Sequence, residues 1–272
     1  MPKLTDWETI EVLVTVKAYP SVSTTYGEAV CVAGVRVDVP TPGWIRLFPV
    51  AFRDLPAERQ FKLFQVIRVR ACKHSTDRRA ETWRPNQDTI EPLEVIEPAR
   101  YWAKRRSFVE PLLGPTMCEL HRGRKGGTPG PSLGLVRPKR VLGIRVTPED
   151  AWSVGQLGTV GQGNLLTSKT DLVKPGHAFA YRYLCEEPGC SGHAQKIVDW
   201  QLGESYRKWP QTGDALIEAI RHKWEDELCG PDRAPMLFVG DQHTRPGQFL
   251  VLGTWSPVRR PDENQLSFQL AA

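Results

Sequence analysis

The chain has 272 residues, of which 40% are hydrophobic and 25% are charged, and it carries a net charge of +5. This composition excludes a fibrous or wholly disordered protein, and no apolar run approaches the ~20 residues that a membrane-spanning helix needs. The first residues also lack the basic start and apolar stretch of a secretory signal. We therefore expect a cytoplasmic globular protein that has no membrane as a partner.

The first 75 residues predict β-strands. The run 10–17 is rich in β-branched residues, and its alternate residues form one apolar face. Two further strands, 28–38 and 44–50, flank the segment 39–43, whose sequence VPTPG is a strong turn signal. We expect these two strands to pair as a hairpin.

This hairpin carries charged and aromatic side chains. Pairing would bring Arg36 near Arg46, and Trp44 would share a sheet face with Arg46. Such a face suits a base or a phosphate. It suits equally a covering helix, with acids such as Asp54 or Glu58 paired to the arginines. The sequence leaves both interpretations open.

The middle of the chain predicts short elements: a helix at 55–64, a strand at 65–72, a polar loop at 73–79 and a helix at 100–113. The segment 121–131 follows, with four Gly, two Pro and three strong cations. That composition predicts a flexible basic loop rather than a helix, and such a loop can wrap a phosphate backbone.

A domain boundary is expected at the glycine-rich stretch 148–176, which follows a predicted strand at 141–146. We expect a basic β-rich domain over 1–147, the connection 148–176, and a metal-binding α+β region over 177–272 that can pack as one unit with the first.

The last hundred residues change character. A short strand at 179–184 precedes apolar residues at helical spacing over 194–209, and a second helical pattern covers 214–228. Two apolar strands, 236–239 and 249–252, then flank a polar turn. The predicted fold class is α+β, with a small barrel or curved sheet in the first half and a zinc knuckle, a helix pair and a β-hairpin in the second.

The charge is distributed unevenly. Residues 1–145 hold 24 basic and 15 acidic residues, whereas residues 146–272 hold 12 and 16. This asymmetry favours a polyanionic partner for the first half, such as nucleic acid: DNA or RNA, single strands included. A solvated basic surface would give the same counts.

Rings and cations also stand next to one another in this half, as single-stranded nucleic-acid binders require, although Trp rings are equally common in protein cores. The candidate stacking rings are Trp44, Trp83 and Trp102. The candidate phosphate contacts are Arg36, Arg46, Lys104, Arg105, Arg106, Arg122, Arg124, Lys125, Arg137, Lys139 and Arg140.

The most specific motif is a cluster of Cys and His residues. Cys185, Cys190 and His193 fall within nine residues, with Pro-Gly between the two Cys, at the end of a strand and the expected start of a helix. Thiolate and imidazole at this spacing favour tetrahedral zinc. The fourth ligand is not local: Cys229 is the preferred candidate, because a helical hairpin can return it to the knuckle, and Cys118 and His177 are alternatives.

An iron–sulfur cluster is a second interpretation, with Cys31 or Cys118 added to Cys185, Cys190 and Cys229 as thiolate ligands. Chance clustering of free thiols is a third. If zinc has four protein ligands, its site is structural and catalyses nothing.

Catalytic residues are not disclosed by any strong motif. Two carboxylates beside the knuckle, Asp199 and Glu204, are weak candidates for binding a second ion such as Mg²⁺, although a spacing of five residues along one helix places them on different faces. Asp232, Asp241 and His243 faintly resemble the carboxylate layout of metal-dependent nucleases, which also need Mg²⁺. The leading functional hypothesis is therefore a nucleic-acid-binding protein with a structural zinc site. The alternatives are a metal-dependent enzyme acting on nucleic acid and an interaction subunit that docks an acidic protein.

Overall fold

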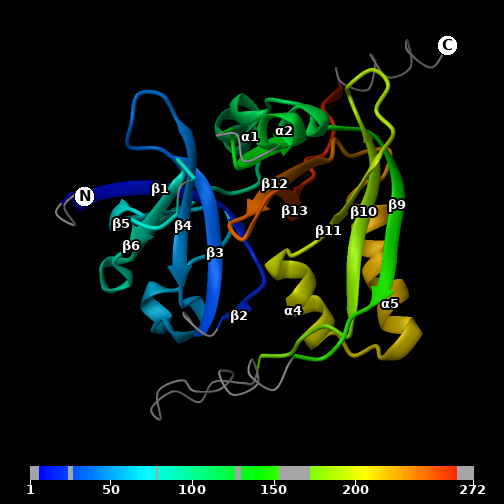
Figure 1. Cartoon of the computed structure of the whole chain (residues 1–272), viewed down its shortest axis with the longest axis horizontal. Coiled ribbons are helices and arrows are strands. Elements are labelled where there is room, and N and C mark those ends of the chain that lie inside the picture. The colour runs from blue at the N-terminus through cyan, green and yellow to red at the C-terminus, as the bar shows by residue number, and fades with distance from the viewer. Residues whose placement is uncertain (1–5, 24–26, 78, 126–129, 153–171, 262–272) are drawn as a thin grey trace.

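The protein is a strand-rich α+β structure, as the sequence predicts. The computed structural model describes residues 6–23, 27–77, 79–125, 130–152 and 172–261. Figure 1 shows the barrel of the first half on one side, the long strands of the second half on the other, and short helices above and below.

A five-stranded barrel forms most of the first half. Its strands follow the order β1-β3-β4-β6-β5, and the pairing of β1 with β5 closes it. A short strand β2 adds to β3, and β7 adds to β5. The bounds are β1 (Glu8–Lys17), β2 (Ser21–Ser23), β3 (Gly27–Arg36), β4 (Gly43–Val50), β5 (Gln65–Lys73), β6 (Thr82–Pro85) and β7 (Glu91–Val95).

Strand β1 is buried on both of its faces. Ile10, Val12 and Val14 pack inside the barrel, while Leu13 and Val16 pack on the outer side. The two-sided burial explains why the strand is almost continuously apolar. The expected hairpin of β3 and β4 is also present, in a register that places Ala33 rather than Arg36 opposite Arg46.

The prediction of a helix at 55–64 is wrong. Only two 3-10 turns form here, η1 (Phe52–Asp54) and η2 (Ala57–Arg59), and a third, η3 (Gln87–Thr89), follows β6. Leu55 and Gln60 are extended. The cause at Leu55 is Pro56, because a residue before proline disfavours the helical conformation.

The prediction of a loop at 121–131 is wrong for its first four residues. They form the last turn of helix α2 (Met117–Arg124), and residues 126–129 lie outside the described part of the chain. A capping box at Thr116 and Glu119 begins the helix and supplies the start signal that outweighs Gly123. The helix expected at 100–113 is present as α1 (Ala103–Val109) and the 3-10 turn η4 (Glu110–Leu112).

Two three-stranded antiparallel sheets build the second half (Figure 1). One has the order β11-β10-β9 and the other β13-β12-β8. Their bounds are β8 (Leu133–Val136), β9 (Pro138–Pro148), β10 (His177–Cys185), β11 (His193–Lys196), β12 (Met236–Gln242) and β13 (Arg245–Trp255). Most of the glycine-rich connection predicted at 148–176 lies outside the described residues, since 153–171 are not among them.

The helices of the second half are α4 (Trp200–Lys208), α5 (Gly213–Arg221) and the π-helix η6 (His222–Glu227), which continues α5. Helix α4 begins later than the 194–209 pattern predicts, because residues 193–196 pair with β10 as β11. Asp199 then caps α4 by accepting a hydrogen bond from Gln201 N–H at 2.8 Å.

A shared core joins the two halves. Leu13 and Val35 of the barrel pack in one cluster with Leu135, Phe238 and Trp255 of the β13-β12-β8 sheet. A separate core lies between the β11-β10-β9 sheet and helices α4 and α5. Among the described residues, none of the helices has the length and apolar character needed to cross a membrane.

Candidate functional site

Three cysteines and one histidine converge at one end of the β11-β10-β9 sheet. Cys118 comes from α2, Cys185 ends β10, Cys190 lies in the following turn, and His193 begins β11. One ligand atom from each lies within 4.8 Å of the other three. The cluster is able to hold a metal ion such as zinc.

The separations inside the cluster suit one central ion. Cys118 Sγ lies 3.6 Å from Cys185 Sγ, and His193 Nε2 lies 3.4 Å from both Cys118 Sγ and Cys190 Sγ. Atoms bound at about 2.0–2.3 Å from a tetrahedral ion are about 3.6–3.8 Å apart. The four residues therefore need only small shifts to reach the coordinating geometry.

The protonation of the cluster also favours a cation. Burial opposes ionisation of Cys190, but hydrogen bonds from the N–H groups of Cys185 and Gly192 outweigh it and lower its pKa. Burial and the two neighbouring thiols raise the pKa of Cys118 to about 12, so three adjacent thiolates are unfavourable without a metal. Burial lowers the pKa of His193, which keeps the imidazole neutral, as a ligand must be.

Local sequence explains how the turn is built. Gly189 and Gly192 have φ of 76° and 102°, values that favour glycine, and both lie in the turn that reverses the chain between the antiparallel strands β10 and β11. Glu187 of this turn binds α2, since it accepts two hydrogen bonds from Arg122, at 2.6 and 2.8 Å, and one from Thr116 Oγ1 at 3.1 Å. These contacts hold Cys118 against the turn.

The preferred fourth ligand of the sequence analysis, Cys229, is not in the cluster. Its Sγ donates to Trp224 O at 3.4 Å, and burial raises its pKa to about 11, so it is a thiol of the core. Cys118, one of the two alternatives, takes that place. Of the other thiols named for a cluster, Cys31 lies on β3 of the barrel.

Several candidate phosphate contacts are buried and bonded inside the protein. Arg46 is 1% exposed and donates to Ser132 Oγ at 2.8 Å, and Arg106 is 1% exposed and pairs with Glu110 at 2.5 Å. Arg124 pairs with Asp241 at 2.7 Å. These three residues are structural, which sequence alone does not reveal because two of the partners are remote.

Other candidates lie at the surface in ion pairs or hydrogen bonds. Arg36 pairs with Glu8 and Asp38, both at 3.0 Å, Lys104 with Glu94 at 2.9 Å, and Arg122 with Glu187. Arg105 donates to Ile96 O at 2.6 Å. Lys125 is exposed and ends α2.

The candidate stacking rings serve the interior. Trp44 packs edge-on against Phe238, with ring centroids 6.0 Å apart, and Trp102 packs against Trp255 at 4.9 Å. Trp83 is 7% exposed. Trp44 and Trp102 are half-buried and each packs edge-on against an interior ring, so base stacking on these rings stays a prediction.

The remaining cations form a basic face on β9 and β10. Arg140 and Arg145 of β9 pair in register with Leu184 and Ala180, and Arg182 lies between these two on β10, so all three point from the same side of the sheet. Arg137 and Lys139 are exposed nearby. We define these five residues as the basic face.

Sequence reasoning included Arg137, Lys139 and Arg140 but missed Arg145 and Arg182. The signal was available in β10, where buried Tyr181 and Tyr183 flank Arg182 and period-two alternation exposes it. The described residues contain no ion-pair partner for any member of the basic face, in contrast to Arg36, Lys104 and Arg122.

The catalytic candidates do not form a single carboxylate site. Glu204 pairs with Arg207 and Lys208, both at 2.8 Å. Asp232 is exposed in the segment between η6 and β12.

Asp199, Asp241 and His243 all line one cleft between the barrel and the second half. The Asp241 carboxylate forms ion pairs with Arg124 Nη2 at 2.7 Å and Arg79 Nη1 at 3.6 Å. His243 Nδ1 lies 3.4 Å from Asp77 Oδ1. Two guanidinium groups already neutralise Asp241, which weakens it as a ligand for Mg²⁺.

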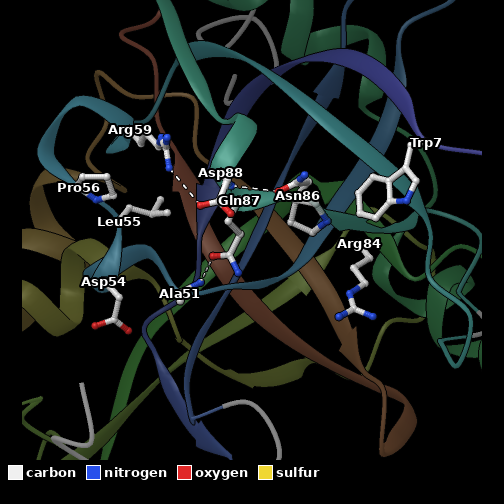
Figure 2. A pocket seen from close by; sticks show the side chains of 11 residues that line it. Trp7, Ala51, Asp54, Leu55, Pro56, Arg59, Arg84, Asn86, Gln87 and Asp88 are labelled. Atoms are coloured by element: carbon white, nitrogen blue, oxygen red, sulfur yellow. Dashed lines mark hydrogen bonds and ion pairs between the residues drawn. The ribbon is translucent and has the colours of Figure 1, made fainter. Parts of the chain in front are cut away.

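A second hollow, of about 590 Å³, lies on the outside of the barrel (Figure 2). Figure 2 shows the Trp7 ring and the Arg84 side chain at one end of it, with Arg59 near the other. Gln87 Oε1 accepts from Ala51 N–H at 2.6 Å, so this amide stabilises the hollow rather than facing a ligand. Arg84 reaches this side because it alternates with Trp83 along β6.

Two family models match most of the chain, each one part of it. The family model described as Domain of unknown function (DUF8757) matches residues 114–271, and that described as Domain of unknown function (DUF8758) matches residues 8–111. A solved structure, a murine DNA-binding protein bound to double-stranded DNA, is 8% identical with a TM-score of 0.31, covering 93% of this chain and 98% of that one. A TM-score this low does not establish a shared fold. The search of curated proteins found no match.

Proposed function

The chain belongs to the DUF8757 family, and we propose that it binds the phosphate backbone of nucleic acid through the basic face, with zinc in the Cys118–Cys185–Cys190–His193 cluster holding that face in place. The observation that carries the proposal is the group of exposed cations Arg140, Arg145 and Arg182 on one side of β9 and β10, for which the described residues supply no ion-pair partner. Uncompensated positive charge of this kind is what attracts phosphates and releases their counterions.

The metal and the basic face belong to the same sheet. Cys185 ends β10 and His193 begins β11, while β9 pairs with β10 along its length and carries two of the arginines. Three thiols and one imidazole are the ligands that structural zinc prefers, and a single ion suits the close spacing better than a multi-iron cluster. With four protein ligands, zinc would have no open position for catalysis.

The test compares two triple variants with the same loss of charge. Arg140→Ala, Arg145→Ala and Arg182→Ala together remove three cations of the basic face. Arg68→Ala, Lys104→Ala and Lys223→Ala together remove three exposed cations that are in ion pairs, with Glu11, Glu94 and Glu227. Affinity for a fluorescent 20-nucleotide DNA or RNA, single- or double-stranded, is measured by anisotropy at several salt concentrations.

We expect the basic-face variant to bind at least 10-fold more weakly and to show a shallower salt dependence, by about 2–3 in log–log slope, because each lost phosphate contact removes about 0.7–0.9. The control variant should retain most of the affinity. Equal losses in both variants, or no loss in the first, would contradict the basic face as the binding surface.

A further inference from the structure

The cleft between the barrel and the second half has a volume of about 620 Å³, within the range of small-molecule sites. Its walls come from both halves of the chain. The first half contributes the segment 18–20 that follows β1, residues of β3 and β4, and Arg79. The second half contributes Glu149 and Trp152 after β9, the segments 174–179 and 196–203, and the β12–β13 hairpin. Junctions of this kind are where ligand sites are commonly found.

One end of the cleft holds a buried cation that makes no direct ion pair with a described carboxylate, although Glu81 and Asp241 lie near it. Arg46 lines the cleft, yet its guanidinium donates only to neutral groups: Thr82 Oγ1 at 3.3 Å, Ser132 Oγ at 2.8 Å and Ser132 O at 3.0 Å. No carboxylate of the described residues lies within ion-pair distance of it. Because a buried charge is unfavourable unless paired, this end favours an anionic group of a ligand.

Gly240 leaves room for that guanidinium. It lines the cleft on β12, and a β-carbon there would lie 3.3 Å from Arg46 Nη2. Arg79 also lines the cleft, beside Arg46, and donates to the backbone oxygen of Asp241 at 2.7 Å. Asp241 Oδ1 is buried there and accepts no hydrogen bond, but the carboxylate is neutralised by Arg79 at 3.6 Å and Arg124 at 2.7 Å.

The other part of the cleft combines rings with a buried acid. Tyr19 and Trp152 line it, and the Tyr19 ring is fixed by packing on Gly203 and by its hydroxyl, which donates to Val173 O at 2.7 Å. Asp199, 5% exposed, lines the same region. Its Oδ1 caps α4, but no described residue donates to its Oδ2.

We propose that this cleft binds a nucleotide, with the phosphate at Arg46, the heterocycle beside Tyr19 and Trp152, and an amino group of the base donating to Asp199. A cation, aromatic side chains and a buried carboxyl can contact the phosphate, the heterocycle and an exocyclic amino group of a nucleotide, respectively. The proposal rests on the proposed nucleic-acid binding in one respect: the nucleotide is either free or an unstacked unit of the bound strand.

The position of Lys196 supports an unstacked unit of the bound strand as the source of the nucleotide. It also lines the cleft, and it pairs in register with Ala180, as Arg145 does from the other side of β10. Lys196 is itself paired with Glu149 at 2.6 Å and is not a member of the basic face, but it lies directly across β10 from Arg145, so a strand held on the basic face passes close enough to deliver a base to the cleft.

The experiment has two arms with the full-length protein. In the first, AMP, GMP, CMP, UMP and inorganic phosphate are titrated by calorimetry. In the second, an oligonucleotide with a single 2-aminopurine is titrated, and its fluorescence rises when that base leaves the stack. Asp199→Asn is compared with Asp226→Asn, a matched change at an exposed residue; asparagine retains the helix cap but changes the group that faces the base.

We expect a nucleotide to bind at least 10-fold more tightly than phosphate, or the 2-aminopurine signal to rise on binding, and Asp199→Asn to weaken whichever is observed at least 5-fold. A response in the first arm identifies a free nucleotide, and a response in the second alone identifies a base of the strand. If neither a nucleotide binds nor the 2-aminopurine fluorescence rises, the cleft proposal is overturned. If the oligonucleotide still binds in a salt-dependent way in that case, the proposed function stands. If instead the oligonucleotide does not bind but a free nucleotide does, the proposed function is wrong and the cleft proposal stands.

Discussion

Cys118 Sγ lies 3.6 Å from Cys185 Sγ, although 67 residues separate the two in sequence. Helix α2 carries one and strand β10 the other, so a shared ion would join the segment that follows the barrel to the sheet that carries the basic face. This geometry identifies Cys118, and not Cys229, as the residue that completes a four-ligand set.

Cys118→Ser is therefore expected to reduce bound zinc from about one per chain to near zero, while Cys229→Ser retains it. Elemental analysis of the purified proteins measures the metal directly. The two substitutions change the same chemical group, one inside the cluster and one in the core, so each serves as the control for the other. Zinc retained in the first and lost in the second would refute the assignment.

Removing the metal with a chelator should also lower the melting temperature, because structural zinc contributes folding free energy. A loss of several kcal/mol corresponds to roughly 10 °C or more in a chain of this size. Nucleic-acid affinity should fall in parallel, since the ends of β10 and β11 are no longer joined. Affinity that is unchanged in the metal-free protein would separate the metal from the binding surface.

The local part of the knuckle could be predicted from sequence because three of its residues fall within nine positions around a Pro-Gly turn. The fourth could not, because the place of Cys118 depends on how α2 packs. The pairing of charged residues could not be predicted from sequence either. Arg124 and Asp241 are 117 residues apart and Arg122 and Glu187 are 65 apart, so counting basic residues could not tell which ones are already paired.

Fold class was predictable because strand alternation and turn residues are local signals. The errors in helices had local causes as well: Pro56 keeps Leu55 extended, and the capping box at Thr116 begins a helix where Gly and Pro predicted a loop. The cleft could not be predicted at all, since Arg46, Asp199 and Gly240 meet only through the packing of three separate segments.

Gly203 is expected to be intolerant of alanine. A β-carbon at this position of α4 would lie 2.0 Å from Cδ2 of the Tyr19 ring, so the ring or the helix would have to shift. Overpacking of this kind lowers the free energy of unfolding by roughly 1–3 kcal/mol, which outweighs the ~1 kcal/mol that alanine contributes in a helix.

Gly123→Ala in α2 is the matched control. A β-carbon there would have no neighbour within 4 Å, so the helix preference acts alone and unfolding should become harder by about 0.5–1 kcal/mol. Urea denaturation measures both variants. Stabilisation in both would mean that Tyr19 moves aside freely, contrary to the packing described for the cleft.

Asp199 should make stability fall as pH rises through the mildly acidic range. Burial raises the pKa of its carboxyl to about 7, against the opposing effects of the Gln201 N–H and Lys17, whereas an unfolded Asp has a pKa of about 3.9. The folded state therefore binds more protons between about pH 4 and 7. The stabilisation is fully present below pH 4 and is lost as pH rises through 7.

The full shift corresponds to a change on the order of 4 kcal/mol over that window. Asp199→Asn cannot titrate, so the free energy of unfolding of the variant minus that of the wild type should rise from pH 4.5 to 7.5. Taking the difference at each pH removes the contribution of the metal cluster, which changes in the opposite direction as its ligands lose protons. The same difference for Asp226→Asn should be flat, and a flat difference for Asp199→Asn would show that this carboxyl is ionised in the folded protein throughout the range.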